Sequence, residues 1–254
     1  MNTIEISLLR RLNMNLLKRS IKSLLRGLGL ELHRFNPDSS KIARMVASLN
    51  FCDIDTVLDI GANEGQFGEE LRAGGYTGNI VSFEPMAQAH GKLLLHSQGD
   101  LKWKVAARAA IGAGHGSVEL NVAKNSVSSS VLPMLAAHSN AAPESAYGSK
   151  ESAPLRPLDE AAAPYLVNSG NILLKIDTQG YEWHVLDGAS ELLSRSRAVL
   201  IELSLVPLYE GQHLWIDCKA RLEAAGFTLW ALEPVFVDPK NGRTLQMDGL
   251  FIRM

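Results

Sequence analysis

The sequence has few cysteines and no long apolar run, and these absences narrow the class of protein. Its 254 residues include only Cys52 and Cys218 as cysteines, too few for a disulfide framework and without the spacing of metal ligands. We expect both to be small buried residues in a reducing compartment. No run of about eighteen apolar residues occurs, so no transmembrane helix is predicted. Basic residues interrupt the apolar N-terminus, which argues against a secretory signal and for a cytoplasmic location.

A strong net charge is also absent. The formal net charge is −2, so bulk electrostatics give no reason to expect a nucleic-acid partner. Residues 1–35 differ from the rest, because leucines at helical spacing stand beside the basic residues Arg10, Arg11, Lys18, Arg19, Lys22 and Arg26. This pattern is typical of a helix in peripheral contact with an anionic membrane, here its inner face, or of an ordinary surface helix. We expect a helical extension over residues 1–40 and a second domain over 41–254; the oligomeric state is not indicated.

From residue 41 onward, apolar strand-like runs alternate with helical segments. Strands are predicted at 56–60, 79–83, 103–107, 171–176, 198–203, 227–232 and 250–254, and helices at 41–49, 66–73, 88–96, 182–193 and 216–225. This alternation predicts an α/β fold with a mostly parallel sheet and helices on both faces. A turn signal at 238–242 predicts an antiparallel edge, and 117–122 alternates like an exposed strand. Residues 125–154, rich in Ser, Ala, Pro and Gly, are predicted to form a long loop or lid.

The stretch at 57–67, Val-Leu-Asp-Ile-Gly-Ala-Asn-Glu-Gly-Gln-Phe, predicts a buried strand, a glycine turn and the start of a helix. Such a turn lets the backbone approach a ligand, and the helix N-terminus offers free N–H groups. These features alone favour a phosphate. Asp59 at the entrance of the turn repels phosphate and suits a cationic, hydroxyl-rich nucleoside. S-adenosylmethionine is the common molecule of that kind.

The same glycines allow a second interpretation. Gly61, Gly65 and Gly68 have the spacing found in short-chain dehydrogenases. Those enzymes also need a Tyr and a Lys four residues apart on one helix. The nearest pair here, Tyr147 and Lys150, is three apart in a segment rich in Gly, Ser and Pro, which disfavours this interpretation.

Acidic residues follow two further predicted strands. Glu84 lies where a doubly wound sheet places the ribose of a bound nucleoside, and a carboxylate there can accept from both ribose hydroxyls. Asp177 ends another buried strand near the same edge and can bind the methionine part of the cofactor or orient the acceptor. Glu182, in the first turn of the next helix, is either functional or a structural cap. Lys175 lies in a buried run and therefore needs a charged partner or a function.

Five motifs in order give the chain a family resemblance: V-L-D-I-G-A-N-E-G-Q-F, S-F-E-P, N-S-V-S-S-S, L-L-K-I-D-T-Q-G-Y-E and L-Q-M-D-G-L-F-I-R. Over residues 50–254 the chain resembles the FkbM family of S-adenosylmethionine-dependent methyltransferases. The resemblance implies a Rossmann-like class I methyltransferase fold, with a seven-stranded, mostly parallel sheet whose last strand is antiparallel. It also implies O-methylation, since relatives often methylate sugar or polyketide hydroxyls. The residues it assigns are Asp59, Gly61, Asn63 and Gly65 in the cofactor turn, Glu84 at the ribose and Asp177 at the methyl-transfer crevice.

One departure from the family pattern concerns the adenine. Relatives often carry an acidic residue in a turn after the third strand, whereas this chain has Ala110-Ile111-Gly112-Ala113-Gly114. We therefore expect the adenine to be bound there by backbone groups around Ala110.

A hydroxyl acceptor is a weak nucleophile, so a general base is expected. The candidates are Asp177, His184 and Glu202, with His213 a further one in a loop at 206–214. Asp177 and Glu202 also suit a divalent ion, but no dense carboxylate or histidine cluster is seen, and no metal is predicted. The leading hypothesis is O-methylation of a saccharide, glycolipid or other small hydroxylated acceptor. The alternatives are an N-methyltransferase acting on a small molecule, and a non-catalytic relative that binds cofactor or a partner.

Overall fold

The computed structural model describes residues 19–167 and 169–254, which divide into two compact units with the boundary between Arg44 and Met45. In the first unit, residues 19–27 form a helix. In the turn that follows the helix, Gly29 has φ 74° and the Leu30 N–H donates to the Leu25 carbonyl, a common helix termination. The part of the predicted N-terminal helix that falls on residues 1–18 lies outside the described residues. Among the residues described, every helix is too short or too polar to span a lipid bilayer.

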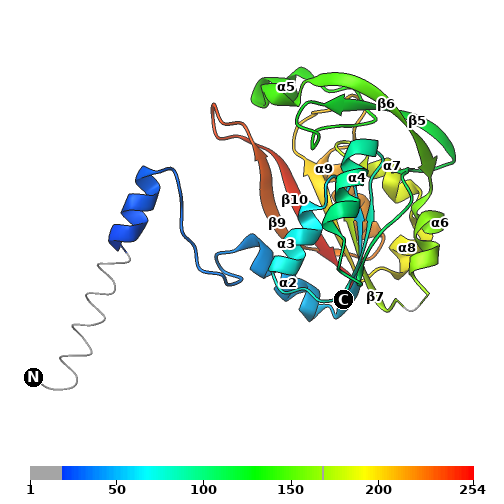
Figure 1. Ribbon diagram of the computed structural model, residues 1–254, viewed down its shortest axis with the longest axis horizontal. Helices are drawn as coiled ribbons and strands as arrows, with labels where there is room; N and C mark the ends of the chain where they lie inside the picture. Colours follow the sequence, from blue (N-terminus) through cyan, green and yellow to red (C-terminus); the bar gives the residue numbers. More distant parts are fainter. Residues whose placement is uncertain (1–18, 168) are drawn as a thin grey trace, which may run out of the picture. The chain divides into compact units, whose positions relative to one another are not determined.

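The second unit is built on a seven-stranded sheet (Figure 1). The strand order is β3-β2-β1-β7-β8-β10-β9, and β10 runs antiparallel to both of its neighbours while β3, β2, β1, β7 and β8 pair in parallel. The predicted sheet with an antiparallel last strand is therefore confirmed. The strands are β1 (Ile54–Ile60), β2 (Asn79–Phe83), β3 (Trp103–Val105), β7 (Asn171–Ile176), β8 (Ala198–Ser204), β9 (Thr228–Val237) and β10 (Thr244–Ile252).

Helices cover both faces of this sheet. One face carries the main apolar core, in which Leu58, Leu174 and Ile201 pack with residues of α6 to α9. On the other face, the side chain of Lys175 lies over the Phe67 ring of α3, because successive residues of a strand point to opposite faces. The helices are α2 (Lys41–Phe51), α3 (Gln66–Ala73), α4 (Ala87–His96), α6 (Leu158–Ala162), α7 (Glu182–Asp187), α8 (Ser190–Arg195) and α9 (Trp215–Ala224).

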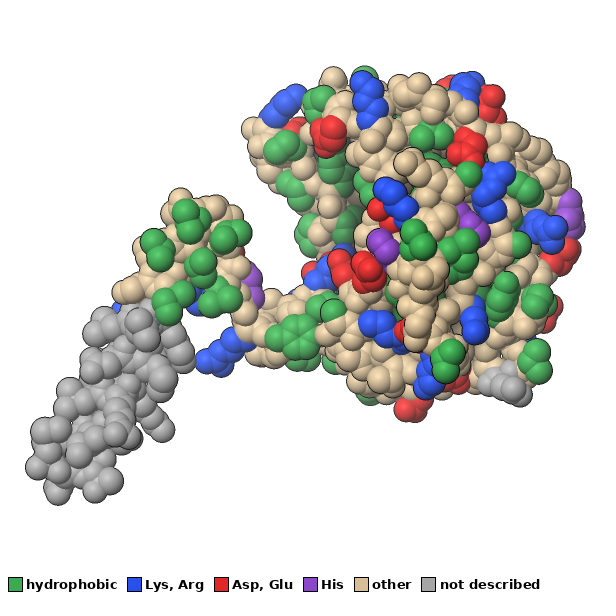
Figure 2. Space-filling model, in the orientation of Figure 1, with side chains coloured by type: hydrophobic (Ala, Val, Ile, Leu, Met, Phe, Trp, Pro, Cys, Tyr) green, Lys and Arg blue, Asp and Glu red, His purple; other side chains and the backbone are tan. Residues whose placement is uncertain are grey.

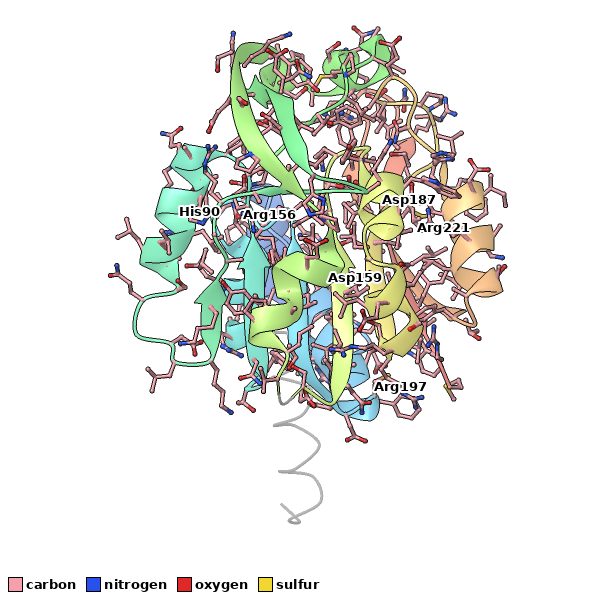
Figure 3. All side chains as sticks on the ribbon, turned by 90° about the vertical axis from the view of Figure 1, so that its right-hand side faces the viewer. His90, Arg156, Asp159, Asp187, Arg197 and Arg221 are labelled. Atoms are coloured by element: carbon pink, nitrogen blue, oxygen red, sulfur yellow. The ribbon has the colours of Figure 1, made fainter. Side chains whose placement is uncertain are left out.

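The single helix predicted over 182–193 is wrong, because the structure divides it into α7 and α8. At the break, Gly188 packs so closely on Gly112 that an added β-carbon would lie 2.0 Å from the Gly112 carbonyl oxygen, and the Gly188 carbonyl accepts from the Asp159 N–H at 3.1 Å. Asp159 then starts α8 separately, since its carboxylate accepts from the backbone N–H groups of Glu191 and Leu192 at 3.0 and 2.8 Å (Figure 3).

The loop predicted over 125–154 is also wrong in its second half. A three-stranded sheet of order β4-β6-β5 is formed by β4 (Ala110–Ile111), β5 (Gly116–Ala123) and β6 (Tyr147–Arg156), with α5 (Ala136–Ala141) and a short 3₁₀ helix (Pro143–Ser145) in between. Most residues of β6 are exposed or partly exposed, so no apolar alternation marks it in the sequence. Leu120 and Ala153 attach this ribbon to the second unit's core by packing against Met86 and Ala89.

Candidate functional site

The glycine turn after β1 lies in contact with the end of β7. Gly61 has φ 80°, and a β-carbon there would lie 1.8 Å from the carbonyl oxygen of Asp177. The N–H groups of Gly61 and Ala62 both donate to Phe83 O at the end of β2, at 3.0 and 3.1 Å. Only glycine permits this approach, so the turn brings together the C-terminal ends of β1, β2 and β7.

The rest of the turn leads directly into α3. Asn63 adopts a left-handed conformation (φ 49°), and its N–H donates to Glu84 Oε2 at 2.8 Å. Gly65, with φ 104°, is the residue before the first turn of α3. Of the predicted cofactor-turn residues, Gly61, Asn63 and Gly65 therefore lie on one continuous loop that ends at a helix N-terminus, whereas Asp59 lies in β1 just before it.

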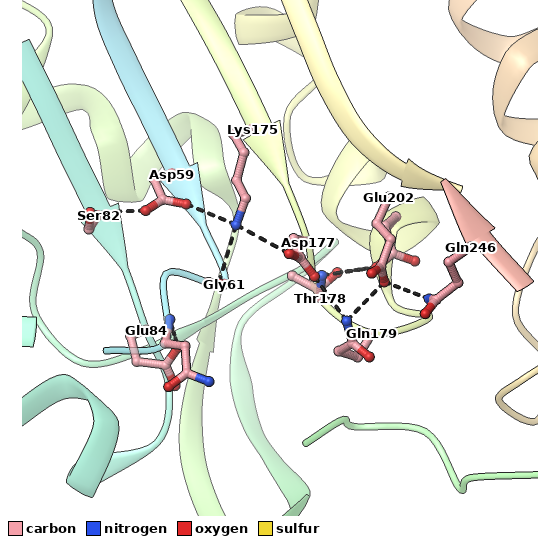
Figure 4. Close-up of polar contacts among 12 residues, drawn as sticks. Asp59, Gly61, Ser82, Glu84, Lys175, Asp177, Thr178, Gln179, Glu202 and Gln246 are labelled. Carbon is pink, nitrogen blue, oxygen red and sulfur yellow. Dashed lines mark hydrogen bonds and ion pairs between the residues drawn. The ribbon is translucent and has the colours of Figure 1, made fainter. Parts of the chain in front are cut away.

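Beneath the turn, a buried lysine joins two of the predicted carboxylates (Figure 4). Lys175 Nζ lies 3.1 Å from Asp59 Oδ1 and 3.4 Å from Asp177 Oδ2. Burial lowers the pKa of Lys175, but the two carboxylates outweigh this effect and raise it above its ordinary value, so the side chain is charged. The expectation that Lys175 needs a charged partner is confirmed. Asp59 is fully buried, with Ser82 Oγ donating to its other oxygen at 3.3 Å.

Glu84, at the end of β2, is also buried. Its two oxygens accept from the N–H groups of Asn63 and Met86, each at 2.8 Å. Burial raises the pKa of Glu84 to about 7, despite these two hydrogen bonds. The carboxylate is thus positioned beside the turn at the place where a sheet of this type holds a ribose.

A second polar network extends from Asp177 to β8 and β10, with Gln179 at its centre. Gln179 Nε2 donates to Asp177 Oδ1 at 3.0 Å and to Glu202 Oε2 at 2.9 Å (Figure 4). Tyr209 Oη donates to Gln179 Oε1 at 2.6 Å, and Gln246 Nε2 donates to Glu202 Oε2 at 2.7 Å. Gln179 holds this position in a left-handed conformation (φ 54°), which is uncommon for a residue with a β-carbon.

Glu202 is the buried member of this network. Burial and the neighbouring carboxylates of Asp177 and Glu182 raise the pKa of Glu202 well above its ordinary value. Sequence reasoning selected Glu202 as a candidate base but not Gln179, Tyr209 or Gln246. Gln179 and Gln246 lie inside the motifs K-I-D-T-Q-G-Y-E and L-Q-M-D-G, and this position was the sequence feature that could have identified them as site residues.

The serine-rich segment 125–130 bridges the two halves of the site. Asn63 Nδ2 donates to Ser126 Oγ at 3.3 Å, and Ser130 Oγ donates to the carbonyl of Gln179 at 2.7 Å. The segment therefore touches both the glycine turn and the loop after β7. The N-S-V-S-S-S motif has no charged side chain, and in the structure it connects these two loops through hydrogen bonds.

The two candidate histidines lie apart from these contacts. The His184 ring stacks on Tyr181, with ring centres 4.2 Å apart, and burial lowers the pKa of His184. The His213 ring stacks on Trp183. Glu182 does not cap α7. Its carboxylate instead accepts from the N–H groups of Thr178 and Gly180 in the loop before the helix.

Ala110 lies in β4 of the small sheet, where it pairs with Leu155 of β6. In the part of the chain that the structure covers, no three or more His, Cys, Asp and Glu side chains are grouped as around a metal ion.

The strand order, the antiparallel β10, and the glycine turn flanked by strand-end carboxylates define a class I methyltransferase. The family model described as the methyltransferase FkbM domain matches residues 59–229. The chain therefore belongs to the FkbM methyltransferase family, and S-adenosylmethionine is its methyl donor. No curated protein matches it in sequence.

Several solved structures are similar to the chain. Magnesium protoporphyrin IX methyltransferase from Synechocystis PCC 6803, solved with bound S-adenosylmethionine, has 12% identity and a TM-score of 0.45, covering 84% of this chain and 78% of its own. TehB from Haemophilus influenzae has 10% identity and a TM-score of 0.45, covering 83% and 62%. The methyltransferase domain of a bacterial Hen1 has 12% identity and a TM-score of 0.46, covering 85% and 100%.

Proposed function

We propose that this methyltransferase acts on a hydroxyl oxygen of a saccharide, a glycolipid or another small hydroxylated acceptor. The observation that carries the proposal is the position of Asp177. Its carboxylate is 34% exposed, and its N–H donates to Ile60 O at 3.1 Å, directly beside the glycine turn. A hydroxyl is a weak nucleophile, and a carboxylate at this place can accept its proton during the transfer.

The residues around the turn fit S-adenosylmethionine by their chemistry. Glu84 offers carboxylate oxygens for the ribose hydroxyls. The carboxylates of Asp59 and Asp177 share the single cation Lys175, so this group beside the turn keeps one net negative charge. An acidic turn favours a sulfonium compound over a pyrophosphate. When bound, the cofactor supplies an electrophilic methyl group.

The carboxylate of Asp177 is held from two sides. Lys175 lies 3.4 Å from Oδ2, and Gln179 donates to Oδ1 at 3.0 Å. Gln179 is itself fixed by Tyr209, so the orientation of Asp177 is set by residues of β7 and of the loop after β8. Since methyl transfer is an in-line displacement, such fixed geometry at the acceptor contributes directly to the rate.

Neutral polar side chains near the turn support a hydroxylated acceptor. Asn63, Asn125, Ser126 and Ser129 are all partly exposed. Amides and hydroxyls both donate and accept hydrogen bonds, which is the chemistry that saccharide hydroxyls require.

The test compares Asp177→Asn with Asp187→Asn. Asp187 is also an ion-paired aspartate, since Arg221 on α9 lies 2.7 Å from it, but it is exposed at the C-terminal end of α7 (Figure 3). Both variants are assayed for S-adenosylmethionine affinity by calorimetry and for transfer of labelled methyl to a panel of saccharides and amines.

We expect Asp177→Asn to lower kcat about 100-fold or more with the cofactor Kd changed only a few-fold, and Asp187→Asn to behave as wild type. An unchanged kcat in Asp177→Asn contradicts the assigned role. A product methylated only on nitrogen identifies an N-methyltransferase, and cofactor binding without transfer to any acceptor identifies a binding protein.

A further inference from the structure

The described part of the N-terminal unit exposes an unusual number of large apolar side chains. The helix at 19–27 and the chain that follows carry six of them at 42–69% exposure, namely Ile21, Leu24, Leu28, Leu30, Leu32 and Phe35. Figure 2 shows hydrophobic side chains gathered on this segment. A contiguous exposed apolar surface of this kind marks an interaction site rather than ordinary surface composition.

The apolar and basic residues of the helix lie on separate faces. Ile21, Leu24 and Leu28 are spaced three and four residues apart and so form one stripe. Lys22 and Arg26 are four apart, and helical geometry places them on the opposite side. The helix is therefore amphipathic, with its cations on the face opposite the apolar stripe.

The charge of the chain is strongly divided between its parts. Residues 1–35 contain seven Lys and Arg residues against two Glu residues, a net charge of +5, although the whole chain has −2. Residues 36–254 therefore carry −7. Within the described segment, Glu31 forms a local ion pair with Arg26 at 3.0 Å, so this acid is engaged within the segment.

We propose that the surface formed by residues 19–35 binds an anionic lipid bilayer and makes the enzyme a peripheral membrane protein. The leucines enter the boundary between headgroups and acyl chains, while Lys22 and Arg26 lie among the lipid phosphates. The exposed leucines favour a lipid bilayer over a nucleic acid as the ligand, because binding to nucleic-acid phosphates depends on basic residues and not on an apolar stripe.

The experiment is vesicle flotation of the full chain with phosphatidylglycerol–phosphatidylcholine vesicles, and with phosphatidylcholine alone. Two double variants remove each half of the surface: Leu24→Gln with Leu28→Gln, and Lys22→Gln with Arg26→Gln. Matched controls make the same changes on the methyltransferase unit: Leu95→Gln with Leu101→Gln, which are 62% and 86% exposed, and Lys104→Gln with Arg243→Gln.

We expect binding to the anionic vesicles that weakens as salt is raised. Removing two charges is expected to weaken it about 30-fold, and removing the two leucines at least about tenfold, with both controls as wild type. The proposal is overturned if the full chain stays unbound at low salt, or if the leucine variant binds as well as wild type. It is equally overturned by tighter binding to RNA that ignores the leucines, or by leucine-dependent dimers on size-exclusion chromatography without vesicle binding.

Discussion

Gly61 gives the sharpest test of how the cofactor turn is built. In Gly61→Ala the new β-carbon would lie 1.8 Å from the carbonyl oxygen of Asp177. The alanine would also be strained by the backbone φ of 80°. Gly75→Ala is the matched control, because Gly75 has φ 93° but nothing within 4 Å of the added carbon. The control therefore measures the backbone strain alone, about 1–2 kcal/mol. The overlap at Gly61 adds about 1–3 kcal/mol, since the ends of β1 and β7 must separate.

The assay is urea unfolding followed by tryptophan fluorescence, together with calorimetric titration of S-adenosylmethionine. We expect Gly61→Ala to lose about 2–5 kcal/mol of unfolding free energy and to bind cofactor at least about 100-fold more weakly, and Gly75→Ala to bind normally. Equal stability losses in the two variants, or an unchanged cofactor Kd in Gly61→Ala, would refute this explanation of the turn.

Three further predictions concern burial, positioning and helix propensity. Burial raises the pKa values of Glu84 and Glu182 from 4.5 to about 7, so the folded state binds more protons than the unfolded state between pH 4.5 and pH 7. The free energy of unfolding therefore falls as the pH rises through this window, by up to about 3 kcal/mol per group. Urea unfolding at pH 5 and pH 7.5 should show this fall, and it should be smaller in Glu84→Gln; a rise would contradict it. Tyr209→Phe removes the hydrogen bond to Gln179. We expect kcat to fall several-fold, which corresponds to about 1 kcal/mol in activation free energy, with the cofactor Kd unchanged. Wild-type kinetics in this variant would show that Tyr209 is not needed to hold Gln179 in place. Gly91→Ala, on the exposed face of α4 with nothing within 4 Å, should raise unfolding free energy by about 0.5–1 kcal/mol in the same urea assay, and a loss would indicate an unseen contact.

The central strands β1, β2, β7 and β8 of the main sheet were predictable because nearly all of their residues are buried. Runs such as Val57–Ile60 and Ile172–Ile176 are almost wholly apolar, and the glycine turns and acidic residues mark their C-terminal ends. The small sheet was not predictable in this way. Its strand β6 consists mainly of exposed polar and small residues and is defined by pairing with β5. The break between α7 and α8 lies where Gly188 packs against Gly112, a residue distant in sequence.

The candidate site was likewise predictable only in part from the sequence. Asp59, Glu84 and Asp177 were recognised because each lies at or directly after the C-terminal end of a buried parallel strand, and such ends meet at one edge of a sheet. Gln179, Tyr209 and Gln246 are neutral and come from three separate elements, so only the order β7-β8-β10 brings them to Glu202. The ion pair of Lys175 with Asp59 was anticipated only as a need for some partner, because the register of β1 with β7 decides which one.

The measurement that tests the central claim most directly is calorimetric titration of the wild-type chain and Glu84→Ala with S-adenosylmethionine, and of the wild type with NAD. The site described here predicts saturable binding of S-adenosylmethionine, strongly weakened in Glu84→Ala, and no binding of NAD. Binding of NAD alone, or of S-adenosylmethionine with the same affinity in Glu84→Ala, would show that the ends of β1 and β2 do not form the cofactor site.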